Sequence, residues 1–356
     1  MASRSVTYGA AALAAGAGIV GVGLGTILGG LVRDALKAEL AVDDGPDHLL
    51  SEPTHPVERR TVRTADGTRI NVVGYGEDTG GDIIVAAHGW SCNTSYWYPQ
   101  VNDLAKSTRV YAYDQRGHGD SERGRARPTM AMLGQDLDAV LAEVVPPGRR
   151  AILLGHSMGG MTIMSWAAQY PQRVTEVASS VVLTSTAAKA AVQNHELIPV
   201  DLPRFTKPFA PLASRVIMGT PMPLPHAKGG ARVSHYVALG PNARRSHVEF
   251  VDEMILACSP RARAGWGSAM GKLDVVSGLH NLRVPTTVVV GSHDRLTPAK
   301  HAEQIAEVLR GTGYLRDLVV LEGVGHMSSI EAATTYNELL NEILDEVSSP
   351  SLAQVD

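Results

Sequence analysis

The chain has little cysteine and few aromatic residues. Its 356 residues include two cysteines, Cys92 and Cys258, and aromatic side chains make up 5% of the total. Two cysteines can form one disulfide bond or none, which excludes a disulfide-stabilised scaffold and leaves the redox compartment open. Neither a C-x-x-C nor an H-x-x-x-H spacing occurs, so these common zinc-site patterns are missing. We therefore expect neither a metal ion nor another cofactor.

Positive charge is not in excess either. The sequence has 32 lysine and arginine residues against 36 aspartate and glutamate residues, a formal net charge of -4, and its arginines are scattered. A protein that binds nucleic acid needs a basic field to attract the phosphates. We therefore expect no nucleic-acid partner. The 44% of hydrophobic residues is enough to bury a large core, as in a globular enzyme.

Charged residues are missing altogether between Arg4 and Arg33, where glycine and alanine dominate. This segment is long enough to cross a bilayer as a helix, although it has few large aliphatic residues. Glycines at every fourth position from Gly21 to Gly29 have the spacing that lets membrane helices pack closely. Residues 1–40 are thus a membrane anchor, a secretory signal or a helix packed on the protein itself. We prefer the anchor, which predicts a membrane-associated rather than a soluble cytoplasmic protein.

Beyond this segment, apolar runs of strand length alternate with segments of helical periodicity. DIIVAAHGW and VPTTVVVGSHD have the pattern of buried strands, and RPTMAMLGQDLDAVLAEVV has apolar residues at helical spacing. Such alternation predicts the α/β class, with a mostly parallel sheet covered by helices on both faces. The Asp66-Gly67 turn signal between two short β-like runs predicts a hairpin before the alternation begins.

The alternation stops between Ala187 and His280, where prolines cluster and the later part has a helical pattern. A segment of this length without strands predicts an inserted helical cap rather than a loop. The predicted organisation is an N-terminal apolar helix (1–40), a linker (41–60), the first part of the α/β core (61–186), the cap (187–280), the second part of the core (281–349) and a tail (350–356).

The stretch AILLGHSMGG, residues 151–160, has the pattern of a strand, a sharp turn and a helix. Ser157 lies at the turn, and Gly155 and Gly159 allow the strand and the helix to approach closely. A serine hydroxyl is a weak nucleophile by itself, so it needs a base, an acid that orients the base, and donors for an oxyanion. Ser157 is therefore the candidate nucleophile.

Catalytic groups of a parallel sheet lie at the carboxyl ends of its strands. Of the thirteen histidines, His326 follows the last apolar run, LVVLEGVGH, and is the candidate base. Asp294 ends the run VPTTVVVGSHD and is the candidate orienting acid, with Asp274 as the less favoured alternative. The backbone N–H groups of Met158 and Trp90 are the expected oxyanion donors, because one follows the nucleophile and the other follows a neighbouring strand.

Other polar residues of these motifs have structural interpretations. We expect Asp114, Arg116 and His118 to stabilise a turn, and His88 and His156 to form structural hydrogen bonds. The methionines of the cap fit either an apolar pocket or ordinary packing; they are Met218, Met222, Met254 and Met270.

Taken together and in this order, HGW, DQRGHGDS, GHSMGG, GSHD and GVGH resemble the α/β-hydrolase superfamily, in its branch with an inserted helical cap. The resemblance runs from about Thr61 to Val347. It implies an eight-stranded, mostly parallel sheet and a triad of Ser157, Asp294 and His326. The HGW loop differs from the HGGG form of one lipase and esterase subgroup. The serine nucleophile disfavours epoxide hydrolase and haloalkane dehalogenase chemistry.

These observations predict a serine hydrolase that cleaves carboxylic esters through an acyl-enzyme on Ser157. The cap and the apolar N-terminal segment favour a lipophilic ester or lipid substrate, hence an esterase or lipase. Two alternatives stay open. The same triad serves thioesterases, carbon–carbon bond hydrolases and cofactor-free perhydrolases of the haloperoxidase kind. The second alternative is a binding protein that retains the fold without turnover.

Overall fold

An eight-stranded sheet forms the centre of the molecule, in the order β1-β2-β4-β3-β5-β6-β7-β8. The computed structural model describes residues 22–37, 45–55, 57–191, 195–197, 203, 206, 209–220 and 230–349. The strands are β1 (Val57–Arg63), β2 (Arg69–Tyr75), β3 (Ile83–Ala87), β4 (Val110–Tyr113), β5 (Ala151–His156), β6 (Ala178–Thr184), β7 (Thr286–Gly291) and β8 (Leu315–Leu321). β2 is antiparallel to β1 and β4, and the other neighbours are parallel. The predicted hairpin and the mostly parallel sheet are confirmed.

The central strands are buried along their whole length. Every residue of β3, β5, β6 and β7 is buried, as expected where helices cover both faces of a parallel sheet. Successive side chains alternate between two apolar clusters: Val85 belongs to one and Ile84 to the other. The continuous apolar runs in the sequence thus become the middle layer of the fold.

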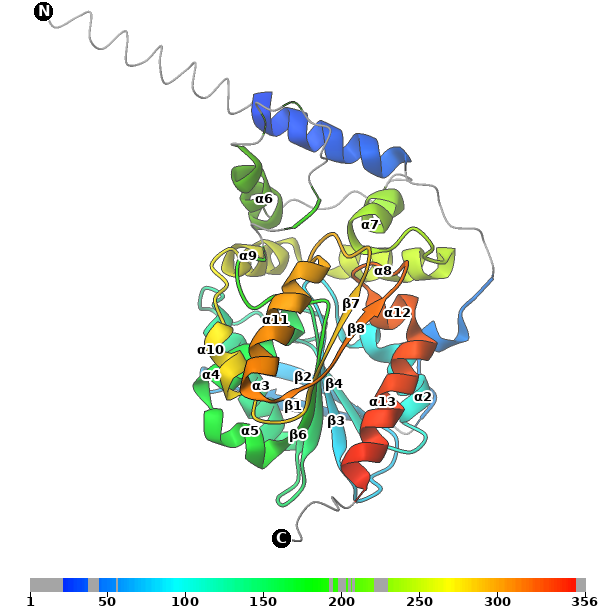
Figure 1. Cartoon of the computed structure of the whole chain (residues 1–356), viewed down its shortest axis with the longest axis vertical. Coiled ribbons are helices and arrows are strands. Elements are labelled where there is room, and N and C mark those ends of the chain that lie inside the picture. The colour runs from blue at the N-terminus through cyan, green and yellow to red at the C-terminus, as the bar shows by residue number, and fades with distance from the viewer. Residues whose placement is uncertain are drawn as a thin grey trace, which may run out of the picture.

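Helices form the two outer layers (Figure 1). One face carries α3 (Met130–Val144), α4 (Met158–Gln169), α5 (Pro171–Val177), α10 (Val276–Asn281) and α11 (Ala299–Thr312). The other carries α2 (Tyr98–Leu104), α12 (Ser328–Glu331) and α13 (Ala333–Ser348), with the short 3-10 helices η1 (His48–Leu50) and η2 (Thr94–Trp97) nearby. α10 ends the segment expected as cap, and it packs against α4.

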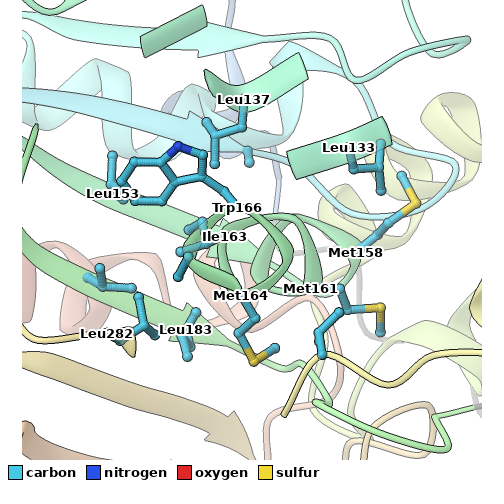
Figure 2. Close-up of a cluster of buried hydrophobic side chains, with 14 of the residues drawn as sticks. Leu133, Leu137, Leu153, Met158, Met161, Ile163, Met164, Trp166, Leu183 and Leu282 are labelled. Atoms are coloured by element: carbon cyan, nitrogen blue, oxygen red, sulfur yellow. The ribbon is translucent and has the colours of Figure 1, made fainter. Parts of the chain in front are cut away.

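α4 is the most deeply embedded helix of its layer. Its residues from Met158 to Ala167 are all buried, and its apolar side chains point in several directions toward α3 and the strands (Figure 2). A helix that is apolar on all sides is stable only inside a protein. The Trp166 ring is fully buried, and its indole N–H donates to an Asp138 carboxylate oxygen at 3.0 Å. This packing fixes the turn that precedes α4.

The cap consists of α6 (Ala210–Gly219), α7 (Gly230–Ala238), α8 (Arg245–Ala257) and α9 (Pro260–Met270), as far as the structure describes it. These helices lie between β6 and β7 in the sequence and form a layer at one end of the sheet (Figure 1). The predicted helical character of this insertion is therefore correct. Cys92 of the core and Cys258, which follows α8, are both buried free thiols.

A helix of residues 22–37 lies across the outside of the cap, over α6 and α7 (Figure 1). Gly23 of this helix packs against the Phe209 ring, and the Arg232 guanidinium donates to the Leu36 carbonyl at 2.9 Å. In the part of the chain that the structure describes, no helix has both the length and the apolarity needed to cross a membrane. Residues 1–21 and 38–40 of the predicted N-terminal segment, residues 41–44 of the predicted linker, and the tail from 350 lie outside the described residues.

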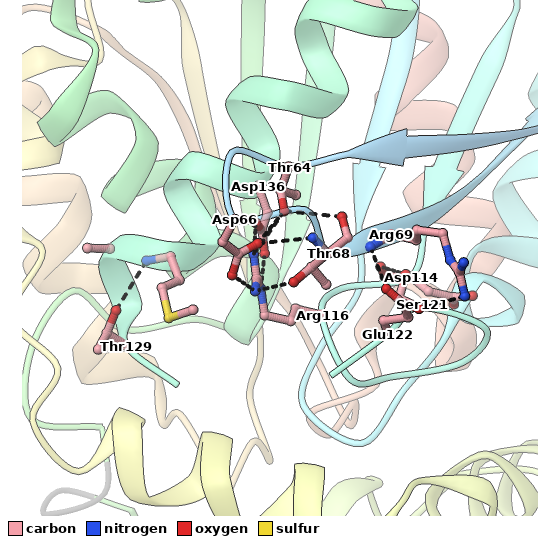
Figure 3. A network of polar contacts seen from close by, with 12 residues as sticks. Thr64, Asp66, Thr68, Arg69, Asp114, Arg116, Ser121, Glu122, Thr129 and Asp136 are labelled. Atoms are coloured by element: carbon pink, nitrogen blue, oxygen red, sulfur yellow. Dashed lines mark hydrogen bonds and ion pairs between the residues drawn. The ribbon is translucent and has the colours of Figure 1, made fainter. Parts of the chain in front are cut away.

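Arg116 anchors the glycine-rich turn that follows β4 (Figure 3). Its guanidinium donates to both oxygens of Asp136 at 2.6 and 2.7 Å and to Asp66 at 2.6 Å. The Arg116 and Asp136 side chains are 3% and 2% exposed, so the two buried charges compensate each other. The Trp266 indole N–H of α9 donates to the Arg116 carbonyl at 2.7 Å, which ties the cap to this turn. Arg116 thus has the turn-stabilising role expected from the sequence.

Candidate active site

Ser157 lies between β5 and α4 with a backbone φ of 52°. This left-handed conformation is strained for a residue other than glycine, so surrounding contacts must hold it. The Ser157 N–H donates to the Thr184 carbonyl at 2.9 Å, and the Thr186 hydroxyl donates to the Ser157 carbonyl at 2.7 Å. A Cβ at Gly159 would overlap the Ala87 carbonyl, so glycine is required where α4 crosses β3. The turn therefore presents a strained, almost buried serine at the carboxyl end of the sheet.

His326 and Asp294 form a buried pair beyond the ends of β8 and β7. The His326 Nδ1 lies 2.9 and 3.0 Å from the two carboxylate oxygens of Asp294, and the two side chains are 4% and 0% exposed. An ionised carboxylate only accepts hydrogen bonds, so Nδ1 is the donor and Nε2 of the neutral ring is left as an acceptor. The pair therefore has the tautomer that a general base needs.

Asp294 is itself held by the loop that follows it. Its Oδ1 accepts the backbone N–H groups of Leu296 at 2.9 Å and Thr297 at 2.8 Å, and its Oδ2 accepts the Thr297 hydroxyl at 2.8 Å. Asp274, the alternative acid considered from the sequence, forms an ion pair with Lys189 at 2.8 Å, and its side chain is 54% exposed. The structure thus brings Asp294, and not Asp274, to His326.

Ser157 and His326 line the same cavity, of about 210 Å³, between the core and the cap. Its wall is mainly apolar and comes from both parts of the fold: Met161, Leu296 and Met327 from the core, and Met218, Val233, Val237, Ile255 and Met270 from the cap. Of the methionines considered earlier, Met218 and Met270 line the cavity, Met254 packs in a core cluster, and Met222 lies outside the described residues.

The two residues expected to supply oxyanion donors, Met158 and Trp90, lie near Ser157. Met158 is the first residue of α4, and the N–H groups of a first helical turn have no partner inside the helix and carry the positive end of its dipole. Trp90 follows β3 and lines the cavity beside Ser157. Its indole N–H donates to the Arg263 carbonyl of α9 at 2.8 Å, so the cap fixes this ring. A Cβ at Gly89 would overlap the His156 ring, which shows how closely the two loops approach.

A family model described as "Serine aminopeptidase, S33" matches residues 81–333, which is most of the chain. The chain belongs to the serine aminopeptidase S33 family of α/β-hydrolases. The superfamily predicted from the HGW, GHSMGG, GSHD and GVGH motifs is therefore confirmed. The matched residues include the strands from β3 to β8 and the candidate triad of Ser157, Asp294 and His326.

Individual relatives of this S33 hydrolase agree with that assignment. The pimeloyl-[acyl-carrier protein] methyl ester esterase of Neisseria meningitidis is 28% identical over 278 residues, covering 75% of this chain and 79% of that protein. An esterase structure from Thermogutta terrifontis matches with a TM-score of 0.61 and 22% identity, over 82% of this chain and all (100%) of the other. The structure of a membrane phospholipase A matches with a TM-score of 0.62 and 19% identity, over 98% of this chain and 99% of the other. The two structures establish the α/β-hydrolase fold.

Two further histidines support the S33 site without lining its cavity. His88 accepts the Gln115 N–H at 2.9 Å through Nε2, and burial lowers the pKa of His88 to about 4. His156 donates from Nε2 to the His326 carbonyl at 3.0 Å and stacks on the Tyr96 ring. Burial, reinforced by His326, holds the pKa of His156 well below its usual range. Both rings are therefore neutral and structural, as the sequence interpretation expected.

Sequence reasoning missed two polar residues of the S33 site. Thr297 binds Asp294 and lies 3.3 Å from the His326 Nδ1 through its hydroxyl. Glu331 accepts hydrogen bonds from backbone N–H groups beside His326 and in the cap. Thr297 lies three residues beyond Asp294, and Glu331 lies five residues beyond His326. That spacing was the available signal, since Ser, Thr and carboxylate side chains commonly cap nearby backbone groups.

Proposed function

We propose that this chain is a serine hydrolase that cleaves carboxylic esters through an acyl-enzyme on Ser157. The observation that carries the proposal is the buried His326–Asp294 pair, which opens on the same cavity as the strained Ser157. A nucleophile, a base and an acid at the ends of three strands are the parts that acyl transfer needs. Family membership and the esterase among its relatives support the same reaction class.

The reaction follows from the roles of these groups. The Ser157 Oγ attacks the ester carbonyl while His326 Nε2 takes the hydroxyl proton, and Asp294 stabilises the imidazolium that forms. The N–H groups of Met158 and Trp90 donate to the oxyanion of the tetrahedral intermediate. The intermediate collapses when the C–O bond to the leaving alcohol breaks and His326 returns the proton to that oxygen. Water, deprotonated by His326, then releases the acid and restores Ser157.

We propose a lipophilic acyl group as the part of the substrate that the cavity holds. The wall beside Ser157 is built from methionine, valine, leucine and isoleucine side chains. The free energy of binding becomes more favourable when an alkyl chain displaces water from such a wall. Methionine side chains also adapt to chains of different shape. The substrate class is therefore an ester of a fatty acid or of another apolar acid.

The test is hydrolysis of p-nitrophenyl esters from acetate to laurate by the wild-type chain and by Ser157→Ala. Turnover is expected to rise with chain length until the cavity is filled, and to fall by at least about 10³-fold in Ser157→Ala. The control is Ser348→Ala, which removes an exposed serine of α13 and is expected to leave turnover unchanged. Ester hydrolysis that persists at the wild-type rate in Ser157→Ala would contradict the proposal.

The same triad supports other reactions, and one outcome would favour them. One outcome is that no ester of the series is cleaved while a serine-directed phosphonate still labels Ser157. The reaction is then thioester hydrolysis, cleavage of a carbon–carbon bond next to a carbonyl, or perhydrolysis, in which hydrogen peroxide takes the acyl group and forms a peracid. If neither turnover nor labelling occurs in the folded protein, the binding-protein alternative is favoured instead.

We also propose that the helix of residues 22–37 rests on a lipid bilayer. Its inner side chains, Ile27, Leu31 and Ala35, are buried against the cap, so this part lies along the surface of the protein. Its outer side exposes further apolar side chains, and α6 adds another: Val22, Leu28, Val32, Leu36 and Leu212 are 63%, 43%, 46%, 48% and 42% exposed.

A helix with one buried and one exposed apolar side suits a membrane interface. Arg33 and Lys37 lie at the end of the exposed apolar side, where cations attract anionic lipid headgroups. In the sequence, the uncharged stretch that begins after Arg4 leads into this helix. The structural match to a membrane phospholipase A extends over this region as well. The cap, which supplies much of the cavity wall, would then lie next to a source of lipophilic substrate.

A further inference from the structure

The backbone of the cap contacts the backbone of the turn that carries His326. The N–H groups of His326 and Met327 both donate to the carbonyl of Ala238, the last residue of α7, at 3.0 and 3.2 Å. A Cβ at Gly240 would overlap the Gly323 carbonyl, and a Cβ at Gly325 would overlap the backbone of the cap turn. This contact therefore has room for glycine only, on both sides.

A single carboxylate closes the contact. The Glu331 Oε2 accepts the Gly240 N–H of the cap at 2.7 Å, and the two Glu331 oxygens accept the Gly325 N–H at 3.1 and 3.2 Å. Gly325 is the residue directly before His326. Glu331 ends α12, and its backbone N–H donates to the Met327 carbonyl at 2.9 Å, so the side chain starts from a fixed position. The ester-hydrolysis steps above make no use of this carboxylate.

We propose that Glu331 is a positioning residue that fastens the turn of His326 to the cap. It acts through two backbone N–H groups, one on each side of the contact, and does not touch the substrate. The proposal rests on the proposed function, since its purpose is to keep the His326 ring in line between Asp294 and Ser157.

The turn needs such a fastening because its own sequence is flexible. Gly323 has a φ of 76°, and glycines on both sides of Val324 lower the cost of other conformations. A displacement of about 1 Å in a catalytic group costs on the order of 10²-fold in rate. Hydrogen bonds to a charged acceptor are about twice as strong as neutral ones, so a carboxylate is well suited to hold the two N–H groups.

The ionisation of Glu331 falls where it affects function. Burial raises the pKa of Glu331 to about 7, the Asp294 carboxylate adds to the rise, and the Gly240 and Gly325 N–H groups oppose it. Other titratable groups that face this region are His326 on the same turn, His156 at the end of β5, His235 on α7 and Tyr96 on η2. The contact is therefore expected to tighten as pH rises through about 7, when the carboxyl group loses its proton.

The effect on folding stability has the opposite sign. A raised pKa means that the folded protein keeps this proton at pH values where the unfolded chain has lost it. The contribution of Glu331 to stability is therefore complete below its ordinary pKa of 4.5 and decreases as pH rises to about 7. If Glu331 only stabilised the fold, its contribution would be largest at low pH. Its effect on the position of His326 is instead expected to be largest above neutral pH, where the carboxyl group has lost its proton.

The experiment measures the rate at which a p-nitrophenyl alkylphosphonate labels Ser157, as a function of pH around 7, in the full chain. Glu331→Gln is expected to slow labelling by about 10- to 100-fold above neutral pH and to remove the part of the rise that Glu331 contributes. Glu331→Asp keeps the charge and is expected to restore part of the rate. The control, Glu338→Gln, changes an exposed residue of α13 and should label as wild type does.

A second variant acts on the contact from the cap side. Gly240→Ala pushes the cap N–H away through its Cβ without changing the charge of Glu331. It is expected to slow labelling at every pH and to leave the rise near neutral pH in place. Amide hydrogen exchange of the peptide that carries Gly325 is expected to become faster in this variant and in Glu331→Gln.

Two results would overturn the proposal. One is folded Glu331→Gln that labels at the wild-type rate with the wild-type pH profile. The other is hydrogen exchange around Gly325 that is the same in wild type and Glu331→Gln. A wild-type chain that does not label at all would contradict the proposed function instead, and the exchange measurement would still decide the role of Glu331.

Discussion

The hydrogen bonds of Asp294 fix one orientation of the His326 ring. Both carboxylate oxygens face the ring nitrogen, and the Thr297 hydroxyl and two backbone N–H groups hold the carboxylate from behind. With every side engaged, the carboxylate cannot turn away when the imidazolium forms. In the proposed reaction, the charge partner of the base would therefore be in place before the reaction begins, which is the condition for electrostatic preorganisation.

This arrangement predicts the effect of Asp294→Asn. The amide would present an N–H group to Nδ1, favour the tautomer with the proton on Nε2, and remove the acceptor that Ser157 needs. We expect kcat for ester hydrolysis to fall by about 10⁴-fold with little change in stability. Asp274→Asn is the matched control, because Asp274 pairs with Lys189 at the surface, and it should keep full activity. Equal losses in the two variants would argue against the assigned acid.

The candidate catalytic residues were predictable one at a time, because each follows an apolar run that becomes a strand. Ser157 also has small neighbours, which are typical of a tight turn. Asp294 follows the end of β7, whereas Asp274 precedes that strand. Thr297 and Glu331 were not predictable in the same way. Their partners are a neighbouring carboxylate and backbone N–H groups, which leave no pattern of side-chain types in the sequence.

At the scale of elements, periodicity predicted which segments are strands or helices but not where the helices dock. The strand runs are fully apolar, and a strand with two buried faces has only one place in a layered fold. The helices of the cap have weaker patterns. α9 docks through Trp266 on the carbonyl of Arg116, a contact that joins residues 150 positions apart and that no local pattern announces.

The N-terminal helix illustrates the same limit. Its apolar composition left a membrane anchor and a helix packed on the protein as alternatives, because both need apolar side chains. In residues 22–37 the inner side is packed on the cap, and the outer side exposes apolar residues as well. Composition gives the number of apolar residues in this segment, but it does not show which side of the helix each residue occupies.

The bilayer proposal predicts the behaviour of a variant of this helix. Val32→Glu combined with Leu36→Glu places two charges on its outer side, and we expect the fraction that sediments with anionic lipid vesicles to fall by more than about 10-fold. Val57→Glu is the control, since Val57 is 48% exposed on β1, away from the cap. Catalysis of a soluble ester should be unchanged in both. Vesicle binding that survives in the double variant would refute a role for this side of the helix.

For the whole molecule, the decisive feature is that core and cap build one cavity between them. The core supplies Ser157 and His326, and the cap supplies much of the apolar wall. Carbonyl groups of the cap accept hydrogen bonds from both the Trp90 indole and the turn of His326. Substrate preference and catalytic geometry therefore belong to the same packed unit, although their residues are spread from position 90 to position 331.

The most direct test of the central claim is the mass of the protein quenched during turnover of a slowly hydrolysed p-nitrophenyl ester. The account predicts an acyl adduct on the tryptic peptide that contains Ser157, formed in a burst of p-nitrophenolate equal to the enzyme concentration. The adduct should be missing in Ser157→Ala and should decay at the steady-state rate in the wild type. Wild-type turnover without an acyl group on Ser157, or with the acyl group on another residue, would contradict the account.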